Sequence, residues 1–492
     1  MRSRHVLYAA LSVLLCAGPV SGLSVRLNGD RISITANREP LVEVLTRIAQ
    51  SGVNVRVDPQ VRGEVTADVK DADVQEAMDG LLSRFGYVLI WNVIEGPLGP
   101  MPKLDEIQVF FPGKKEKIQP LLGTNANYAV TTGPSGGPEF VQDEILIGFK
   151  PGTRRDAVEL LLSQIGGTVV DSIPGLGIYR VRLAPGTNLI ALIQQLEKNA
   201  LVAVVEPNYI VDAPVPGVRN TAEAGNAGSD DISVPPPLEN VAALAILDSG
   251  LMPIKGLDDV VVGRYDAVNP DRSLGDSLGH GTQMALIASG AVSPQEGTDS
   301  LSVPLVAVRA FDDNGRASNF GLMKSMSYAL ENGARVINMS WGTEVKSDFI
   351  STAVAHAQSK GAILVAAAGN EPTGAAMYPA AYRDVIAVSA LAEGGAIWAN
   401  SNSGDFITLA APGYATFPVG YKGGAGAYAG TSISSAYVSR ALALYFAKHP
   451  KATASEAIQA LKHAVTDIGA TGRDSQYGYG ALDAAAMARF LR

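Results

Sequence analysis

Cysteine is almost missing from this sequence of 492 residues, because it occurs once, as Cys16. That residue lies in an apolar N-terminal segment that we expect to be removed, so the mature chain would have no thiol. A chain without thiols can be neither a cysteine peptidase nor a zinc–thiolate protein, and disulfides cannot stabilise it. Leu15 before Cys16 is not small, which argues against a lipoprotein.

Positive charge and long hydrophobic runs are also scarce. The 39 Lys and Arg residues against 48 Asp and Glu give a net charge of −9, and no basic cluster follows the first residues. Nucleic-acid binding, which needs a basic face, is therefore not expected. Arg2 and Arg4 precede a short apolar stretch, and small residues follow up to Gly22. This pattern predicts a signal peptide over residues 1–22, export, and no membrane span after signal removal.

The length of the chain predicts several domains. Residues 23–95 alternate between strand-like runs and two amphipathic helical stretches, at residues 41–49 and 77–82, and contain no catalytic constellation. This small α+β unit resembles the short N-terminal domain shared by secretins and TonB-dependent receptors. The resemblance implies an envelope protein partner for residues 25–95. Together with the export signal, the resemblance implies that the protein is located in a Gram-negative periplasm or, outside the cell, at the outer-membrane surface.

Two stretches rich in Gly and Pro separate the remaining domains. We interpret residues 96–140 as a linker, and residues 211–240 as an exposed, cleavable one. Between them, residues 141–210 follow the order strand-helix-strand-strand-helix-strand, which is a ferredoxin-like layout.

Apolar strands alternate with helices over residues 241–492. The strands are near-continuous apolar runs, as strands buried on both faces must be. This alternation predicts an α/β fold with a doubly wound, mostly parallel sheet, preceded by the two small α+β domains. Such sheets place their sites at the carboxyl ends of the strands.

Polar residues at ends of strands and helices are the candidates for chemistry. Asp248 ends an apolar run and precedes Ser249-Gly250, which taken alone indicates a turn. Of five histidines, only His280 lies between glycines, which leave its ring accessible to other groups. A general base needs such access and a pKa near neutral.

Ser432 and Asn370 each have an ordinary alternative. Ser432 opens a long helical run after Gly430-Thr431, where a serine commonly caps the helix. The same position suits a nucleophile, because the helix N-terminus favours developing negative charge. Asn370 ends a strand, as a turn residue does or as an oxyanion donor would.

The chain order Asp248, His280, Ser432, with Asn370 between the last two, is the Asp-His-Ser order of subtilisin. Residues 241–485 resemble the subtilisin-like serine peptidases. The motifs that carry the resemblance are Ala245-Ile246-Leu247-Asp248-Ser249-Gly250, Gly279-His280-Gly281-Thr282, Ala367-Ala368-Gly369-Asn370 and Gly430-Thr431-Ser432, supported by Asn338-Met339-Ser340-Trp341-Gly342, Tyr378-Pro379-Ala380, Ala411-Pro412-Gly413 and Gly478-Tyr479-Gly480.

This resemblance implies an endopeptidase that acts on polypeptides. Ser432 would attack the scissile carbonyl, His280 would carry the proton, and Asp248 would hold the imidazole. Asn370 and the Ser432 N–H would bind the oxyanion. The run Ser340-Trp341-Gly342 resembles the strand edge that pairs with extended substrate.

Residues 141–210 resemble the propeptides of this family. The resemblance implies a zymogen whose own propeptide assists folding and acts as an intramolecular inhibitor. We expect autoprocessing within residues 211–240.

Several positions depart from the family pattern. The nucleophile motif continues as Ile433-Ser434-Ser435-Ala436-Tyr437 rather than Met-Ala-Ala-Pro, and Gln283 replaces a common second histidine. Without the proline, the first helical turns should be more regular. Family members often bind calcium, but Asp312-Asp313-Asn314-Gly315 does not have the spacing of a metal loop, so we assign no metal or cofactor.

Two other functions remain as alternatives. The first is a catalytically weak binding protein with a peptidase fold, tethered through its first domain. The second is an α/β-hydrolase esterase, which needs a Gly-x-Ser-x-Gly elbow and the order Ser, acid, His. Ser432 is followed by Ile433-Ser434 rather than by x-Gly, and it comes after Asp248 and His280 in the chain, so the sequence meets neither requirement.

Overall fold

The computed structural model divides the chain into two compact units, which are described separately. The described residues are 23–50, 53–58, 60–96, 99–111, 118–121, 128–133, 137–218, 233–270, 272–295, 301–421 and 425–492. The expected signal peptide, residues 1–22, and residues 219–232 of the expected cleavable linker lie outside them.

The first unit comprises the chain up to Ile94 and residues 101–123. One sheet has the order β1 (Ser24–Asn28), β2 (Arg31–Pro40), β4 (Glu64–Asp73), and another the order β5 (Gly86–Gly96), β6 (Gly99–Phe110), β3 (Asn54–Val57), β7 (Gln119–Pro120). Helices α1 (Leu41–Gln50) and α2 (Val74–Leu81) bury their apolar sides in the same core as strands β2 and β3. The Asp73 side chain caps α2 by accepting from the N–H groups of Gln75 and Glu76.

The interpretation of residues 96–140 as a linker is wrong for much of its length. Strand β6 occupies residues 99–110, and β8 (Val130–Thr131) pairs with the next domain. In β6, Leu104, Ile107 and Val109 are buried in the core of the first unit. The glycines and prolines around residue 100 obscured this strand in the sequence, because such residues ordinarily mark turns.

The second unit begins with a small α+β domain. Its elements are β9 (Phe140–Phe149), α3 (Arg155–Gln164), β10 (Thr168–Ile173), β11 (Ile178–Arg182), α4 (Leu189–Leu196) and β12 (Val202–Asp212). The strand order β10-β11-β9-β12, antiparallel throughout, is the ferredoxin-like layout expected from the sequence. The last residues of β12 also pair with β17 (Arg316–Ser318), so this sheet extends into the following domain.

The larger domain is built on a seven-stranded parallel sheet. Its order is β15 (Val261–Asp266), β16 (Leu305–Arg309), β14 (Ala243–Asp248), β18 (Ala334–Met339), β19 (Ile363–Ala367), β20 (Ile386–Leu391), β21 (Leu409–Pro412). All neighbouring strands are parallel. Strand β15, at the sheet edge, is not one of the near-continuous apolar runs that the sequence analysis used, because it contains Gly263, Arg264 and Asp266.

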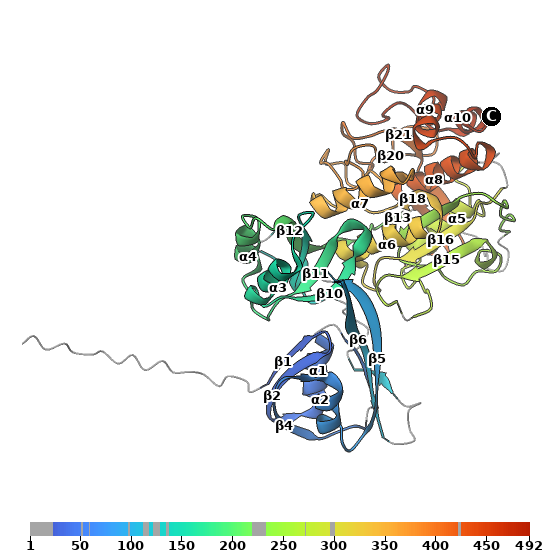
Figure 1. Cartoon of the computed structure of the whole chain (residues 1–492). Coiled ribbons are helices and arrows are strands. Elements are labelled where there is room, and N and C mark those ends of the chain that lie inside the picture. The colour runs from blue at the N-terminus through green and yellow to red at the C-terminus, as the bar shows by residue number, and fades with distance from the viewer. Residues whose placement is uncertain are drawn as a thin grey trace, which may run out of the picture. The chain divides into compact units, whose positions relative to one another are not determined.

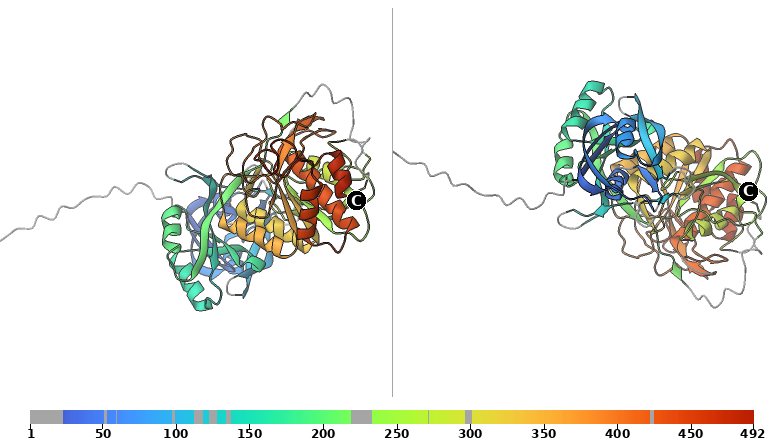
Figure 2. Two further views of the ribbon diagram at one scale, coloured as in Figure 1. Left: turned by 90° about the horizontal axis from the view of Figure 1, so that it is seen from above. Right: turned by 90° about the horizontal axis from the view of Figure 1, so that it is seen from below.

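Helices cover both faces of this sheet (Figures 1 and 2). Helices α5 (His280–Ser289), α8 (Thr431–Lys448), α9 (Ala454–Ala464) and α10 (Ala484–Phe490) pack on one face, and α6 (Asn319–Glu331) and α7 (Asp348–Ser359) on the other. Strand β14 shows why its sequence is continuously apolar: Leu244 and Ile246 enter the first core, Ala245 and Leu247 the second. The doubly wound prediction is confirmed.

The small α+β domain packs against the N-termini of α6 and α7. Asn208 Oδ1 accepts from the Phe320 N–H of α6 at 3.1 Å. The Glu206 carboxylate accepts from the Ser347 hydroxyl and, at 3.1 Å, from the Asp348 N–H of α7. Helix N-termini have unpaired N–H groups, so these two side chains act as caps supplied by another domain.

The first part of the expected cleavable linker, just after β12, contributes one strand to a small antiparallel sheet. Its order is β13 (Gly217–Val218), β23 (Gly426–Ala429), β22 (Tyr414–Phe417). Within the described part of the chain, no helix is long and apolar enough to cross a membrane.

Candidate active site

Asp248 and His280 form a buried pair. Asp248 is the last residue of β14, and His280 is the first residue of α5, which follows a left-handed turn at Gly279. Their atoms Oδ1 and Nδ1 are 2.7 Å apart, and both side chains are almost fully buried. The fold therefore brings these two residues together as the sequence predicted.

A third acid, Asp276, ties the two loops together and was missed in the sequence. Its Oδ1 accepts from the Ser249 hydroxyl and the Gly279 N–H, both at 2.8 Å. Its Oδ2 accepts from the Thr282 N–H at 2.8 Å and the Thr282 hydroxyl at 2.6 Å. Asp276 thus joins the turn after Asp248 to the first turn of the His280 helix. No sequence signal distinguishes it, because its partners are mostly backbone and hydroxyl groups.

The environment of His280 stabilises its charged form. Burial lowers the pKa of His280, but the charge and hydrogen bond of Asp248, with the charge of Asp276, outweigh burial and raise the pKa above its ordinary value. A carboxylate at Nδ1 leaves Nε2 as the nitrogen that exchanges a proton with a substrate or nucleophile.

Ser432 lies in the first turn of α8, directly after Gly430-Thr431. Its hydroxyl donates to the Ser340 carbonyl at 3.2 Å, and its side chain is buried. His280 Nε2 is also buried and has no hydrogen-bond partner among the described residues. The structure therefore shows the Asp248–His280 hydrogen bond, and it shows the Ser432 hydroxyl bonded to a backbone carbonyl.

The Asn370 amide contacts the start of α8 through its oxygen and an extended peptide through its nitrogen. Its Oδ1 accepts from the N–H and the hydroxyl of Thr431, both at 2.9 Å. Its Nδ2 donates to the carbonyl of Val215 at 3.3 Å. A Cβ on Gly430 would lie 3.3 Å from this Nδ2, so the glycine permits the close approach.

The peptide bound by Asn370 belongs to the chain itself. We call residues 210–218 the strap segment. It continues from β12 along β17, where Ala213 N–H donates to the Gly315 carbonyl at 2.7 Å. It then passes Asn370 and pairs with β23 through Gly217 and Val218. The sequence predicted residue 210 as the end of the propeptide unit and residues 211–218 only as part of an exposed linker.

The predicted substrate-binding run Ser340-Trp341-Gly342 follows β18. The Trp341 side chain is 1% exposed and packs edge-on against Phe311 in the second core. The Ser340 carbonyl accepts from Ser432, as described above. Only the backbone of this run is therefore available for pairing with a peptide.

The departures from the expected motifs leave the local structure regular. Helix α8 continues without a break from Thr431 to Lys448, as expected without a proline. Tyr437 is fully buried in the first core. Gln283 Nε2 donates to the Val419 carbonyl at 2.9 Å.

The described residues contain no group of three or more His, Cys, Asp or Glu side chains arranged to hold a metal ion. In the acidic loop at residues 312–315, Asp312 Oδ1 accepts from the N–H groups of Asn314 and Arg316, each at 2.9 Å. This is the geometry of a turn.

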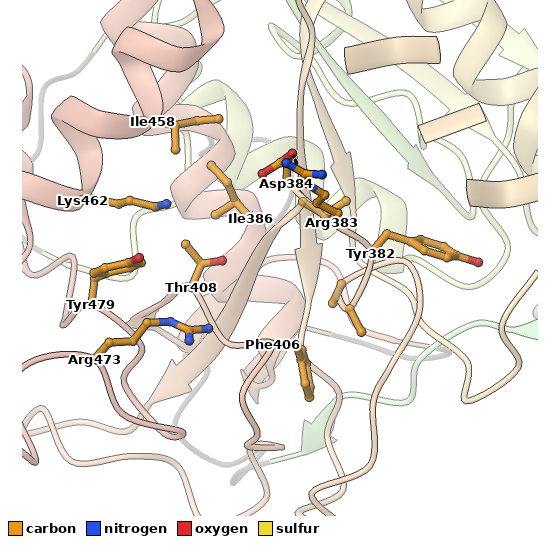
Figure 3. Close-up of a pocket in the computed structure, with 13 residues that line it drawn as sticks. Tyr382, Arg383, Asp384, Ile386, Phe406, Thr408, Ile458, Lys462, Arg473 and Tyr479 are labelled. Carbon is orange, nitrogen blue, oxygen red and sulfur yellow. Dashed lines mark ion pairs between the residues drawn. The ribbon is translucent and has the colours of Figure 1, made fainter. Parts of the chain in front are cut away.

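A surface hollow in the same domain does not involve the candidate residues (Figure 3). Lys462 and Arg473 lie over the ring of Tyr479, at 4.8 and 5.7 Å from its centre. None of Asp248, His280, Ser432 or Asn370 lines it. Lys462 and Arg473 have aromatic or carbonyl partners, and Arg383 pairs with Asp384, so we assign the hollow no chemistry.

Two family descriptions match the second unit. The subtilase family matches residues 241–480, and the fervidolysin N-terminal prodomain matches residues 126–208. Residues 25–95 lie outside both matches, so their resemblance to the secretin and TonB-dependent receptor domain stays a prediction.

Known proteins agree with these matches. The chain is 31% identical to subtilisin DY of Bacillus licheniformis over 265 residues, which cover 50% of this chain and 90% of that protein. It is 33% identical to the minor extracellular protease Epr of Bacillus subtilis over 248 residues, 50% of this chain but only 38% of Epr.

A solved structure shows the same fold. Fervidolysin from Fervidobacterium pennivorans, described as a keratinolytic enzyme related to subtilisin, aligns with a TM-score of 0.59 and 23% identity, covering 74% of this chain and 63% of that one. The chain belongs to the subtilase family of serine peptidases, and a fervidolysin-like prodomain precedes its peptidase domain.

Proposed function

We propose that this subtilase is a serine endopeptidase in which Asp248, His280 and Ser432 form the catalytic triad and Asn370 is the oxyanion donor. The observation that carries the proposal is the buried 2.7 Å contact between Asp248 and His280 at the carboxyl end of β14. Sites of doubly wound sheets lie at this edge. An intact acid–imidazole pair also argues against the alternative of a catalytically weak binding protein.

Each residue takes the role that its contacts support. Ser432 Oγ attacks the scissile carbonyl, and His280 Nε2 takes the hydroxyl proton and then gives it to the leaving amine. Asp248, bonded to Nδ1, holds the imidazole tautomer and stabilises the imidazolium. Before attack, the Ser432 hydroxyl must turn from the Ser340 carbonyl towards His280.

The oxyanion forms on the former carbonyl oxygen, and Asn370 Nδ2 with the Ser432 N–H would bind it. Asn370 Nδ2 already donates to a peptide carbonyl, that of Val215. Thr431 fixes the amide by donating twice to its oxygen. Such a preorganised donor costs little reorganisation during the reaction. The backbone at Ser340-Trp341-Gly342 would pair with extended polypeptide substrates.

We also propose that the chain is made as a zymogen that processes itself within residues 211–240. The strap segment passes Asn370 in this structure, and the prodomain caps α6 and α7. Both observations support inhibition by the chain's own N-terminal part.

Substitution of the nucleophile tests this proposal. Purified wild-type protein should be shortened within residues 211–240 and should hydrolyse denatured casein. Ser432→Ala should stay full length and inactive, because Ser432 Oγ is the only attacking atom in the scheme. Ser434→Ala is the matched control: Ser434 is buried in the same helix and bonded to the Ala411 carbonyl at 3.0 Å, and its removal should leave hydrolysis. Casein hydrolysis by Ser432→Ala at the wild-type rate would refute the assignment.

For location, we propose export to a Gram-negative periplasm or outer-membrane surface, with residues 25–95 contacting an envelope protein. The support is the signal-like N-terminus and the resemblance of residues 25–95. Deleting residues 23–123, which removes the whole first unit together with β6, should release the protein from the envelope fraction while casein hydrolysis persists. Unchanged fractionation would contradict this role.

A further inference from the structure

The strap segment is held beside the catalytic residues at three places. Its first part pairs with β17 between Ile210 and Asp212, and its last part pairs Gly217 with Ala429 of β23. Between them, the Val215 carbonyl accepts from Asn370 Nδ2. The fit is close, because a Cβ on Gly217 would lie 3.0 Å from the Trp398 ring. These contacts describe a built binding site for this segment.

The contact with Asn370 identifies the peptide bond that faces the catalytic residues. Asn370 Nδ2 is the proposed oxyanion donor, so the carbonyl that it binds stands where a scissile carbonyl would stand. That carbonyl belongs to Val215, and the bond that follows it is Val215–Pro216. Pro216 is buried, and a second proline, Pro214, precedes Val215.

Proline is a poor residue to follow a scissile carbonyl in this chemistry. Its nitrogen carries a ring carbon where other residues carry hydrogen, and its φ is fixed. His280 must deliver a proton to that nitrogen for the amine to leave. The ring adds bulk at this point and restricts the preceding residue, Val215.

The catalytic side chains around this bond are not engaged for attack. The Ser432 hydroxyl donates to the Ser340 carbonyl, and His280 Nε2 has no hydrogen-bond partner among the described residues. The Val215 side chain is 68% exposed, so it does not anchor its residue in a pocket. A misplacement of about 1 Å can cost roughly a hundredfold in rate. The bond is therefore bound without being aligned for cleavage.

We propose that residues 210–218 are a proline-locked inhibitory strap: the active site binds them as a peptide ligand but does not cut the Val215–Pro216 bond, so self-processing occurs at another bond. This inference rests on the proposed function. The strap begins with the last three residues of β12, a strand that the prodomain sheet holds, so its effective concentration at the site is high. Its ligand class is an extended peptide with proline after the residue whose carbonyl Asn370 binds.

Replacing the proline by a residue with an N–H tests the proposal on the full-length protein. In Pro216→Ala and Pro216→Ser, Ser432 Oγ would form an ester with the Val215 carbonyl carbon as the C–N bond breaks. His280 would protonate the nitrogen of residue 216, and water would then hydrolyse the ester. Intact mass and N-terminal sequencing should show a new N-terminus at residue 216. Pro236→Ala, an exposed proline of the same linker, is the matched control.

The proposal predicts no N-terminus at residue 216 in wild type or Pro236→Ala. It predicts that terminus in both Pro216 variants, and its loss when Ser432→Ala is added. A wild-type mature chain that begins at Pro216 would overturn the strap. If both Pro216 variants hydrolyse casein but leave the bond between Val215 and residue 216 uncut, the strap proposal is also overturned. The proposed function would then still stand. Absence of hydrolysis in every preparation would instead remove the proposed function, and the strap with it.

Discussion

At the residue scale, the candidate catalytic residues could be predicted because few residue types perform their chemistry. His280 was distinguished by its flanking glycines, and Ser432 by its place at a helix start. Asp276 could not be predicted, because its four hydrogen bonds go to groups that become neighbours only in the fold. The bond between Asn370 and Val215 escaped prediction for the same reason, since 155 positions separate the two residues.

Asp276 should act as a positioning residue for the Asp248–His280 pair. In Asp276→Asn, one carboxylate oxygen becomes an N–H donor facing groups that themselves donate. We expect kcat to fall about ten- to hundredfold through misplacement of His280, with little change in KM. The lost negative charge should also lower the pKa of His280, so the acidic limb of the kcat profile should move to lower pH.

Asp313→Asn is the control for this prediction, because Asp313 is a partly exposed acid that binds Arg309 and Ser277. Asp313→Asn should leave the pH dependence of kcat unchanged. An Asp276→Asn enzyme with an unchanged acidic limb would show that Asp276 is structural only.

At the scale of elements, the helices were easier to predict than their surroundings. Ser318 caps α6, because its hydroxyl accepts from the Gly321 N–H at 3.1 Å, and serine is a common residue at this position. The caps from Asn208 and Glu206 could not be predicted, because they come from a strand of another domain. Strand β6 was missed because glycine and proline around residue 100 indicated a linker.

The Glu206 cap should make the prodomain contact depend on pH. Burial raises the pKa of Glu206 from 4.5 to about 7, although hydrogen bonds from Ser347 and Asp348 oppose the shift. A raised pKa means that the packed state binds the proton more tightly. The associated stability is full below pH 4.5 and is lost as pH rises through about 7.

This dependence can be measured in the Ser432→Ala background, where no self-cleavage interferes. In the parent, the urea concentration at the unfolding midpoint should decrease as the pH is raised from 4.5 to 7. This decrease should be smaller in Glu206→Gln. The comparison cancels the contributions that the two proteins share. Identical pH dependence in the two proteins would contradict the assignment to Glu206.

At the scale of the whole molecule, alternation of apolar strands and helices was enough to predict the doubly wound domain. The linkers were predicted less well, because composition shows where turns occur and not which segments find partners. Residues 211–218, expected as the start of an exposed linker, pair instead with β17 and β23 of the peptidase domain. One chain thus supplies the proposed catalytic residues, the prodomain that caps α6 and α7, and the peptide bound at Asn370.

The central claim is that Ser432 is an activated nucleophile, and covalent labelling tests it most directly. The processed wild-type protein should react with a fluorophosphonate probe, and peptide mass mapping should place one adduct on Ser432. Ser432→Ala should not react, whereas Ser434→Ala should. A wild-type protein that hydrolyses casein without labelling at Ser432, or an adduct on another residue that persists in Ser432→Ala, would contradict the account.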